Sequence, residues 1–251
     1  GLQHEDGHSH IMSATIPNCV SYDPTFAYEV AVILRDGIYR MYQQQEDVFY
    51  YITLLNENYE HPAMPEGAED GIRRGMYLFR TGVNSPQKVQ LMGSGSILRE
   101  VIAAADILQQ QFGVAADVWS VPSFTEVARD GQDVERYNRL YPERTQRVAY
   151  ATQCLRDRQG PVIAATDYIR AYGEQIRPYV PQQHYVVLGT DGYGRSDTRA
   201  NLRKFFEVDR YHVAYAALQG LYAEEQISRT ELVHARKQLG IDINHANPLT
   251  L

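Results

Sequence analysis

Features that mark several large classes of protein are scarce or missing in this sequence of 251 residues. No stretch approaches the roughly 18–20 consecutive apolar residues that a membrane-spanning helix needs, which excludes a protein of that kind. Lysine is scarce, no cluster of basic residues occurs, and the formal net charge is −7. Because nucleic-acid binding depends on neutralising phosphates with basic side chains, we expect neither a nucleic-acid nor a membrane partner.

Cysteine is just as rare, since Cys19 and Cys154 are the only two in the sequence. Secreted chains that rely on disulfides usually carry more, so we expect a cytoplasmic location with both thiols reduced and buried. Arginine and tyrosine are abundant instead: tyrosine occurs 19 times, and all but three of the 24 basic residues are arginines. Both side chains bury a large area while keeping a polar tip, which favours an oligomer with partly polar interfaces.

The sequence also lacks an initiator methionine and a signal peptide, because neither a basic segment nor an apolar run opens it. Glu5 and Asp6 interrupt the first histidines, so the opening does not read as a purification tag. We therefore expect a fragment, or a processed chain, that begins inside a functional segment.

Within the first 87 residues, the sequence predicts one helix, one strand and a connection. Asp23 and Pro24 are typical of a helix start, and apolar residues at helical spacing follow as far as Met41. The β-branched and aromatic run at residues 48–54 predicts a buried strand. Prolines and polar residues mark a connection from residue 56, so we expect a domain boundary between residues 56 and 87.

From residue 88 onward, short apolar segments alternate with helical patterns. Strands are expected at residues 89–92, 115–121, 162–165 and 185–188, and helices at 96–112, 123–140 and within 198–239. Such alternation predicts the α/β class, with an open, mostly parallel sheet and helices on both faces.

The densest group of chemically active side chains is the segment HEDGHSH at residues 4–10, with three of the eight histidines and two carboxylates. Such groups suit general acid–base catalysis near neutral pH. The same residue types also act as metal ligands. A solvated polar loop would look the same, so three interpretations stay open from the residues alone.

Two glycine-containing turns follow predicted strands. The turn GSGS at residues 93–96 lacks the lysine of a P-loop and the third glycine of a dinucleotide site, so we expect a tight strand-to-helix turn. The segment TDGYGRSD at residues 190–197 is either an active-site loop or an ordered turn that caps the next helix. No G-x-S-x-G motif indicates a hydrolase nucleophile.

Longer strings connect the chain with a known family. Glu5-Asp6-Gly7 with His10 resembles the E-D-G-x-x-H motif of transketolase-type thiamine diphosphate enzymes. The strings GLQHEDGHSH, YYITLLNENY, SFTEVARDGQD and VLGTDGYGRSD are similar to the homodimeric decarboxylating component of the bacterial pyruvate dehydrogenase complex. The resemblance extends from Gly1 to Leu251.

The resemblance implies a domain plan and a reaction. Residues 1–75 would be the C-terminal part of a thiamine pyrimidine-binding domain, 76–86 a linker, and 87–251 a C-terminal domain of the transketolase type. The reaction would be decarboxylation of pyruvate, followed by reductive acetylation of a lipoyl group on the dihydrolipoyl acetyltransferase component. The implied partners are therefore pyruvate, that component with its lipoyl domain, and a second copy of the subunit in a homodimer.

The resemblance also assigns site residues. His4, Asp6 and His10 would be catalytic, with His4 near the thiamine and the substrate, and so also a cofactor contact. Proton transfer is the implied task of His4, and orientation or substrate hydrogen bonding that of Asp6 and His10. His8 has no counterpart in transketolase, and its role stays open.

In the family, the residues that hold thiamine diphosphate and Mg²⁺ lie upstream of the stretch that this sequence matches. We therefore expect no metal site in this chain and no turnover by the chain alone. Two alternatives stay open: a dimerisation or assembly module without catalytic activity, and a transketolase. Measuring whether the enzyme turns over pyruvate or a sugar phosphate would distinguish the main prediction from a transketolase.

Overall fold

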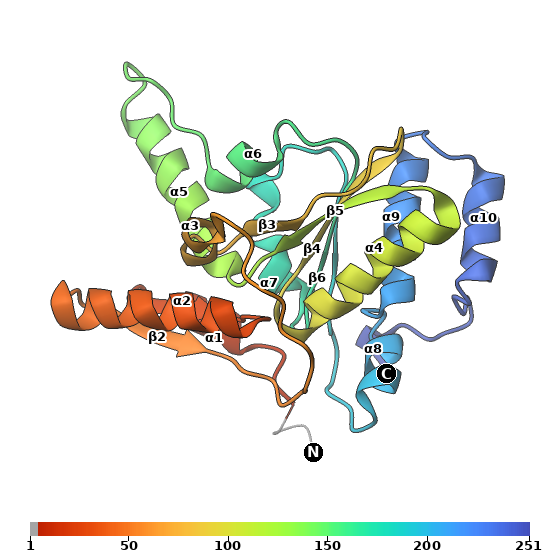
Figure 1. Ribbon diagram of the computed structural model, residues 1–251, viewed down its shortest axis with the longest axis horizontal. Helices are drawn as coiled ribbons and strands as arrows, with labels where there is room; N and C mark the ends of the chain where they lie inside the picture. Colours follow the sequence, from red (N-terminus) through yellow and green to blue (C-terminus); the bar gives the residue numbers. More distant parts are fainter. Residues whose placement is uncertain (1–4) are drawn as a thin grey trace.

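Two sheets of different size organise the chain, of which the computed structural model describes residues 5–251 (Figure 1). The smaller sheet pairs β1 (Cys19–Tyr22) with β2 (Phe49–Ile52) in parallel. The larger sheet has the order β3-β5-β4-β6-β7, built from β3 (Tyr77–Arg80), β4 (Lys88–Gly93), β5 (Ala115–Ser120), β6 (Val162–Ala165) and β7 (Tyr185–Leu188). Its neighbouring strands run parallel except for β3, which is antiparallel to β5 at one edge. The predicted open, mostly parallel sheet is confirmed.

Helices make up most of the remaining structure. Those that precede β3 are α1 (Ser9–Ala14), α2 (Ala27–Ile38), which continues into a π-helical turn at Tyr39–Gln43, and α3 (Ala68–Arg73). Those that follow β4 are α4 (Leu98–Phe112), α5 (Phe124–Leu140), α6 (Tyr150–Leu155), α7 (Arg170–Glu174), α8 (Arg199–Phe205), α9 (Arg210–Ala223) and α10 (Arg229–Gln238). Short 3₁₀ turns occur at Gly95–Ile97, Arg177–Tyr179 and Pro248–Thr250.

Helices cover both faces of the larger sheet, as predicted (Figure 1). Successive side chains of a strand point to opposite faces, so adjacent residues of one strand enter different cores. Leu91 joins the core beneath α4 and α9, whereas Met92 joins the core beneath α5, α6 and α7. Both side chains are fully buried, because β4 is the central strand between two covered faces.

The N-terminal part of the chain differs from its prediction in two places. Helix α1 and strand β1 form within residues 9–22, for which no helix or strand was predicted. Helix α2 begins at Ala27 and not at Asp23, because the Glu29 carboxylate accepts the backbone N–H groups of Thr25 at 2.5 Å and Phe26 at 3.0 Å. Asp23 is left in the extended chain after β1, completely buried.

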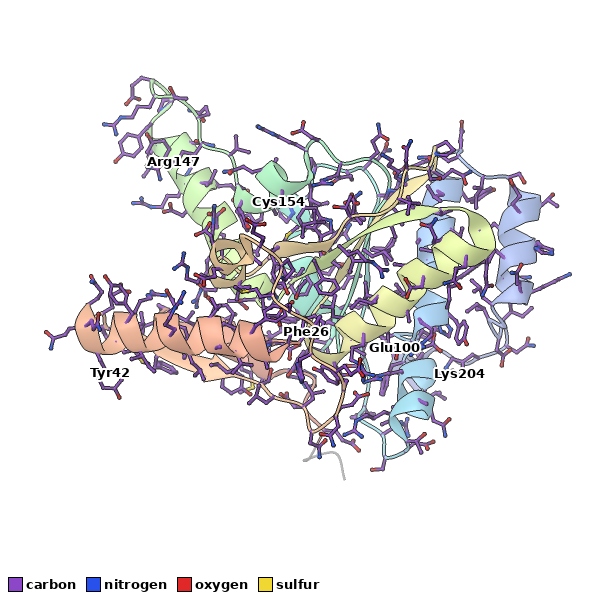
Figure 2. The ribbon with its side chains drawn as sticks, viewed as in Figure 1. Phe26, Tyr42, Glu100, Arg147, Cys154 and Lys204 are labelled. Carbon is purple, nitrogen blue, oxygen red and sulfur yellow. The ribbon has the colours of Figure 1, made fainter. Side chains whose placement is uncertain are left out.

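Strand β2 forms within the predicted run at residues 48–54, but its burial is less complete than predicted. Phe49 is 43% exposed, because within the described residues β2 pairs only with β1. Other apolar side chains of this layer are more exposed still, at 68% for Leu54 and 75% for Tyr42. Tyr42 points away from the body of the protein beyond the end of α2 (Figure 2). Several large apolar side chains of the smaller layer are therefore exposed to solvent.

Part of the predicted linker at residues 76–86 belongs to the larger sheet. Within it, β3 pairs with β5, with Tyr77 opposite Ser120 and Leu78 opposite Trp119. This segment forms an edge strand of the larger sheet that was not predicted. Tyr77 is buried, and Leu78 packs against the core beneath α5. Residues 77–80 thus belong to the larger sheet, and the division into residues 1–75, 76–86 and 87–251 stays a prediction.

Both cysteines are free thiols in the structure. Cys19 is buried and Cys154 is partly buried, so the expectation of full burial holds for Cys19 alone. None of the helices within residues 5–251 has the length and apolar character needed to cross a membrane.

Candidate functional site

The C-terminal ends of strands from both sheets meet beside the segment that carries the predicted catalytic residues. Asp23 follows β1, Thr53 follows β2 and Ser94 follows β4. The Thr53 hydroxyl donates to Asp23 Oδ1 at 2.9 Å, and the backbone N–H of Gly95 donates to the Asp23 carbonyl at 3.0 Å. Ligands of α/β proteins bind outside the carboxyl ends of the strands, so this edge is the candidate site.

A cavity of about 210 Å³ opens beside this edge. Its walls carry three carboxylates and three guanidinium groups, from Glu5, Asp6, Asp167, Arg195, Arg199 and Arg203. Burial raises the pKa of Asp167, although the charges of Arg203 and Arg199 oppose the rise. A cavity with both signs of charge suits a ligand that presents an anionic group together with hydrogen-bond donors.

Asp6 lies in the cavity wall and shapes the start of α1. Its Oδ1 accepts the backbone N–H groups of His8 at 3.0 Å and Ser9 at 2.9 Å, and its Oδ2 accepts the Ser9 hydroxyl. Burial alone would raise the pKa of Asp6, but these hydrogen bonds hold it below its usual value. Asp6 is therefore an ionised residue that fixes the shape of the segment at residues 6–9.

His10 lies behind the cavity wall, enclosed by aromatic rings. Its imidazole stacks on Tyr172 with ring centroids 4.8 Å apart and meets the edges of Tyr168 at 4.6 Å and Tyr51 at 5.5 Å. The side chain is completely buried. Burial lowers the pKa of His10 to about 4, against the opposing charge of Asp6, so the ring is neutral at physiological pH.

The two nitrogens of the His10 ring have different surroundings. Nε2 lies 2.9 Å from the Thr53 hydroxyl oxygen. Nδ1 is buried and has no hydrogen-bond partner among the described residues. In the neutral ring, one nitrogen therefore has a hydrogen-bond partner and the other has none. Which nitrogen donates and which accepts depends on the position of the single ring proton.

Asp23 is a buried carboxyl group at the centre of the site. It has no exposed surface, and its Oδ2 has no hydrogen-bond partner among the described residues. Burial raises the pKa of Asp23 to about 7, with further increases from the charges of Asp167 and Glu29, while the nearby hydroxyls of Ser94 and Thr53 oppose the rise. A carboxyl group with such a pKa changes its protonation state within the physiological range, which is characteristic of functional sites.

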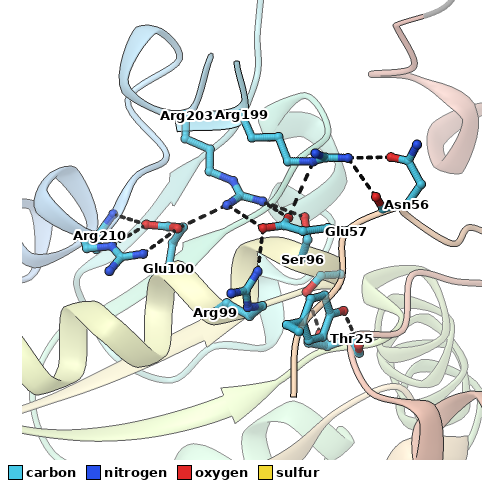
Figure 3. A network of polar contacts seen from close by, with 11 residues as sticks. Thr25, Asn56, Glu57, Ser96, Arg99, Glu100, Arg199, Arg203 and Arg210 are labelled. Atoms are coloured by element: carbon cyan, nitrogen blue, oxygen red, sulfur yellow. Dashed lines mark hydrogen bonds and ion pairs between the residues drawn. The ribbon is translucent and has the colours of Figure 1, made fainter. Parts of the chain in front are cut away.

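A network of arginines and glutamates joins the segment after β2 to α4 and α8 (Figure 3). Glu57 accepts Arg99 at 2.5 Å and also Arg203, whose other nitrogen lies 3.3 Å from Glu100. Arg210 closes the network by donating to Glu100 at 2.9 Å. Burial alone would raise the pKa of Glu57, but Arg203 and Arg99 hold it below its usual value. The network anchors the strand-free chain after β2 against the larger sheet.

The structure brings together some of the predicted site residues. Asp6 lines the cavity and His10 lies behind it, whereas His4 falls outside the described residues. His8, whose role was left open, also lines the cavity. Within residues 5–251, no three His, Cys, Asp or Glu side chains lie close enough together to hold a metal ion. The metal interpretation of residues 4–10 includes His4, which lies outside the described residues, so it stays open.

Sequence reasoning missed three residues of the site: Asp23, Thr53 and Asp167. Each follows a strand directly or within two residues. A polar residue at the end of an apolar run is the signal that would have found them. Asp23 was misread because aspartate followed by proline is also typical of a helix start.

The two predicted turns border the same edge. Residues 93–96 form the expected tight turn from β4 toward α4, and Gly95 takes a positive φ of 50° there. A Cβ at Gly95 would lie 2.5 Å from Asp23 Oδ2, so only glycine leaves room for the carboxylate. In the segment at residues 190–197, Gly192 lines the cavity and Asp197 accepts the backbone N–H of Thr198 at 2.6 Å. The cap of α8 is Thr198 itself, whose hydroxyl accepts the Asn201 backbone N–H, and the active-site role of the segment stays a prediction.

Comparison with known proteins gives two family matches that together cover most of the chain. Residues 1–62 match the pyruvate dehydrogenase E1 component middle domain. Residues 75–209 match the transketolase-like TK C-terminal domain.

A curated relative covers the whole chain. The pyruvate dehydrogenase E1 component of Cupriavidus necator is 59% identical over 100% of this chain, which corresponds to 28% of that relative. The chain thus spans little more than a quarter of the length of its relative.

Solved structures share the fold at low sequence identity. Transketolase from Campylobacter jejuni has a TM-score of 0.61 and 18% identity, over 87% of this chain and 29% of its own. A split-gene transketolase, described as an inactive β4 tetramer, has a TM-score of 0.55 and 14% identity, over 88% of this chain and 63% of its own.

Proposed function

Since this chain belongs to the pyruvate dehydrogenase E1 component family, with a transketolase-like C-terminal domain, we propose that it is part of a subunit that decarboxylates pyruvate. The same subunit would then reductively acetylate the lipoyl group of a dihydrolipoyl acetyltransferase. The observation that carries the proposal is the 59% identity to such a component over the whole chain. A transketolase is disfavoured, because the sequences of the two transketolase structures compared above are only 18% and 14% identical to this chain.

Relatives of this family are generally thiamine diphosphate enzymes, in which the cofactor supplies the carbanion chemistry. In the family, the residues that hold Mg²⁺ and the diphosphate lie upstream of the stretch that this chain matches. We therefore propose that other parts of the complete subunit hold the metal and the diphosphate. No step of the reaction is assigned to those groups from this chain.

The chain's own residues would shape and orient the site. Asp6 holds the turn that brings Gly7 and His8 to the cavity. His10 would orient the reacting groups from behind the wall, since its burial keeps it away from bulk water. His4, assigned by the family resemblance to proton transfer near the thiamine, completes the proposed catalytic set.

An E1 component is one part of a larger complex with other components. We propose a homodimeric subunit that is located in the cytoplasm and receives the lipoyl domain of the acetyltransferase. The apolar surface of the smaller layer, with Leu54 at 68% and Tyr42 at 75% exposure, supports an extensive contact with further protein. The scarcity of cysteine supports the cytoplasmic location, because secreted chains that rely on disulfides usually carry more.

A chimera tests the proposal. This chain replaces the matching stretch of the Cupriavidus necator E1 component, and pyruvate-dependent ferricyanide reduction is measured with thiamine diphosphate and Mg²⁺. We expect the chimera to turn over pyruvate and the 251-residue chain alone to be inactive. A folded chimera that acts on sugar phosphates and not on pyruvate would replace the proposal with transketolase, and turnover by the chain alone would refute the assignment of the cofactor site to other parts.

An assembly role without catalysis has one observation in its favour. The split-gene transketolase that shares this fold is described as inactive and tetrameric. If the chimera assembles as a stable oligomer but never turns over pyruvate, the chain is an assembly module and not part of a catalytic subunit.

A further inference from the structure

The contact between His10 and Asp23 passes through a single hydroxyl group. Thr53 Oγ1 lies 2.9 Å from His10 Nε2 and 2.9 Å from Asp23 Oδ1. The three residues come from different elements, α1, the end of β2 and the end of β1, and the parallel pairing of β1 with β2 brings the last two together. Thr53 therefore connects the buried imidazole with the buried carboxyl group.

A threonine hydroxyl has one proton and can donate only one strong hydrogen bond. Its second possible acceptor, the Tyr22 carbonyl, lies 3.5 Å away, whereas Asp23 Oδ1 lies at 2.9 Å. The proton is therefore directed at Asp23 when that carboxyl group is ionised. The Thr53 oxygen is left as an acceptor toward His10, so His10 Nε2 must carry the ring proton.

Within residues 5–251, the groups around His10 offer no second hydrogen bond to its ring, although the Tyr168 hydroxyl also interacts with Thr53. Around His10 lie the hydroxyl-bearing rings of Tyr51, Tyr168 and Tyr172, and the charge of Asp6 acts on it from the start of α1. None of these groups forms a hydrogen bond with Nδ1, which is buried and unpartnered among the described residues. The contact with Thr53 is thus the only one there that distinguishes the two nitrogens.

The groups that face Asp23 act on its charge. Glu29 is completely buried and Asp167 lines the cavity, and the charges of both raise the pKa of Asp23, whereas the hydroxyls of Ser94 and Thr53 lower it. Gly95 approaches so closely that a Cβ would lie 2.5 Å from Asp23 Oδ2. The carboxyl group is therefore held in one orientation, with Oδ1 toward Thr53.

We propose that Asp23 is a positioning residue that acts through Thr53 to place the ring proton of His10 on Nε2 and to leave Nδ1 as a proton acceptor. This placement decides what His10 can do, since a neutral imidazole accepts a proton only at its bare nitrogen. The value of the arrangement for catalysis rests on the proposed function, but the placement itself does not.

The first test reads the proton directly. Long-range ¹H–¹⁵N spectra of the 251-residue chain, labelled on its eight histidines, distinguish the two neutral forms of each ring. The His10 signals are assigned by their loss in His10→Asn, and the spectra are recorded at a pH well above 7, where Asp23 is ionised. We expect the Nε2-protonated form for His10.

Two substitutions of one residue separate the hydroxyl from the shape of the side chain. Thr53→Ser keeps the hydroxyl and should keep the Nε2-protonated form, whereas Thr53→Val removes it and should abolish that preference. Thr125→Val is a matched control, because Thr125 is buried and its hydroxyl has no partner among the described residues. The inference is overturned if the parent carries its proton on Nδ1, or if Thr53→Val, folded as judged by its other histidine signals, leaves the form unchanged.

The same variants in the chimera test the consequence for turnover. Thr53→Val should lower kcat at least tenfold with little change in KM and should shift the pH profile, while Thr53→Ser should restore both. If the chimera is inactive in every form, the proposed function fails and the spectra still decide the placement. If the chimera is active and Thr53→Val leaves kcat and the pH profile unchanged, the positioning role of Asp23 is refuted even where the spectra agree.

Discussion

Asp23 should make the stability of the protein depend on pH. Its pKa in the folded state, about 7, lies above the ordinary value of 3.8, so the folded protein binds this proton more tightly than the unfolded chain. The stabilising contribution is therefore complete below pH 3.8 and is lost as the pH rises through about 7. Asp23→Asn stays neutral throughout, so its free energy of unfolding relative to the parent should rise by about 3 kcal/mol between about pH 5 and pH 8.

Urea denaturation of both proteins at the two pH values checks this expectation. His10 has the opposite effect, because its lowered pKa of about 4 removes stability as the pH falls from 6.5. That effect is common to parent and variant and cancels in the comparison. An equal difference in stability at both pH values would show that Asp23 has an ordinary pKa.

Gly95 should be much less tolerant of substitution than a glycine with the same backbone conformation elsewhere. Gly95 and Gly113 both have positive φ, at 50° and 68°, but a Cβ at Gly113 meets nothing within 4 Å. Gly113→Ala should therefore cost only the conformational strain, about 1–2 kcal/mol. Gly95→Ala should cost about 1–3 kcal/mol more, because its Cβ would collide with the Asp23 carboxylate. Thermal unfolding of the pair measures the difference, and equal losses would contradict the close approach.

At the scale of the elements, the arginine and glutamate network should hold the segment after β2 in place. Glu57 is 16% exposed and Arg203 12%, so replacing the carboxylate removes the counter-charge of Arg99 and leaves the partly buried Arg203 with Glu100 alone. Glu57→Gln should destabilise the protein by about 1–3 kcal/mol and speed proteolysis within residues 53–63.

Glu69→Gln is the matched control. Glu69 pairs with Arg35 at 2.7 Å, but the two side chains are 42% and 63% exposed, and such pairs contribute about 0–1 kcal/mol. Chemical denaturation and timed digestion with a low dose of chymotrypsin, which can cleave after Leu54, Leu55 and Tyr59, compare the two variants. If Glu69→Gln proves as destabilising as Glu57→Gln, the network does not anchor the segment.

Elements with a strong local signal could be predicted from the sequence, and the others could not. Strand β5 and helix α5 were found because an apolar run and a Ser123 cap, which accepts Glu126 N at 3.0 Å, are local features. Strand β3 was taken for a linker, because its place in the sheet depends on Trp119 and Ser120, about 40 residues further along the chain. Helix α1 is too short to show a helical period and is held by contacts with β1 and α7.

The candidate site was predicted in part for the same reason. Asp6 and His10 lie in one short segment that a motif can reveal. Thr53 and Asp23 are 30 residues apart and meet only because two parallel strands end together. Their burial, and with it the raised pKa of Asp23, is a property of the packed structure and leaves no mark on the sequence.

At the scale of the whole molecule, the exposed apolar surface of the smaller layer should drive self-association of the isolated chain. Leu54 and Tyr42 are 68% and 75% exposed. Replacing both with serine should raise the dissociation constant measured by sedimentation equilibrium at least tenfold. Leu249→Ser, at a side chain that is 56% exposed near the other end of the chain, should leave the dissociation constant unchanged. A monomeric parent at all accessible concentrations would refute the expectation.

The central position of β4 makes its amide hydrogens suitable for measuring the stability of the whole protein. Both edges of β4 are paired, with β5 and β6, and Val89, Leu91 and Met92 have no exposed surface. Its amide hydrogens can therefore exchange with solvent deuterium only when the whole sheet opens. Their exchange rates report the global free energy of unfolding in the absence of denaturant, so the cost of any substitution discussed above can be read from this one strand under the conditions in which the protein acts.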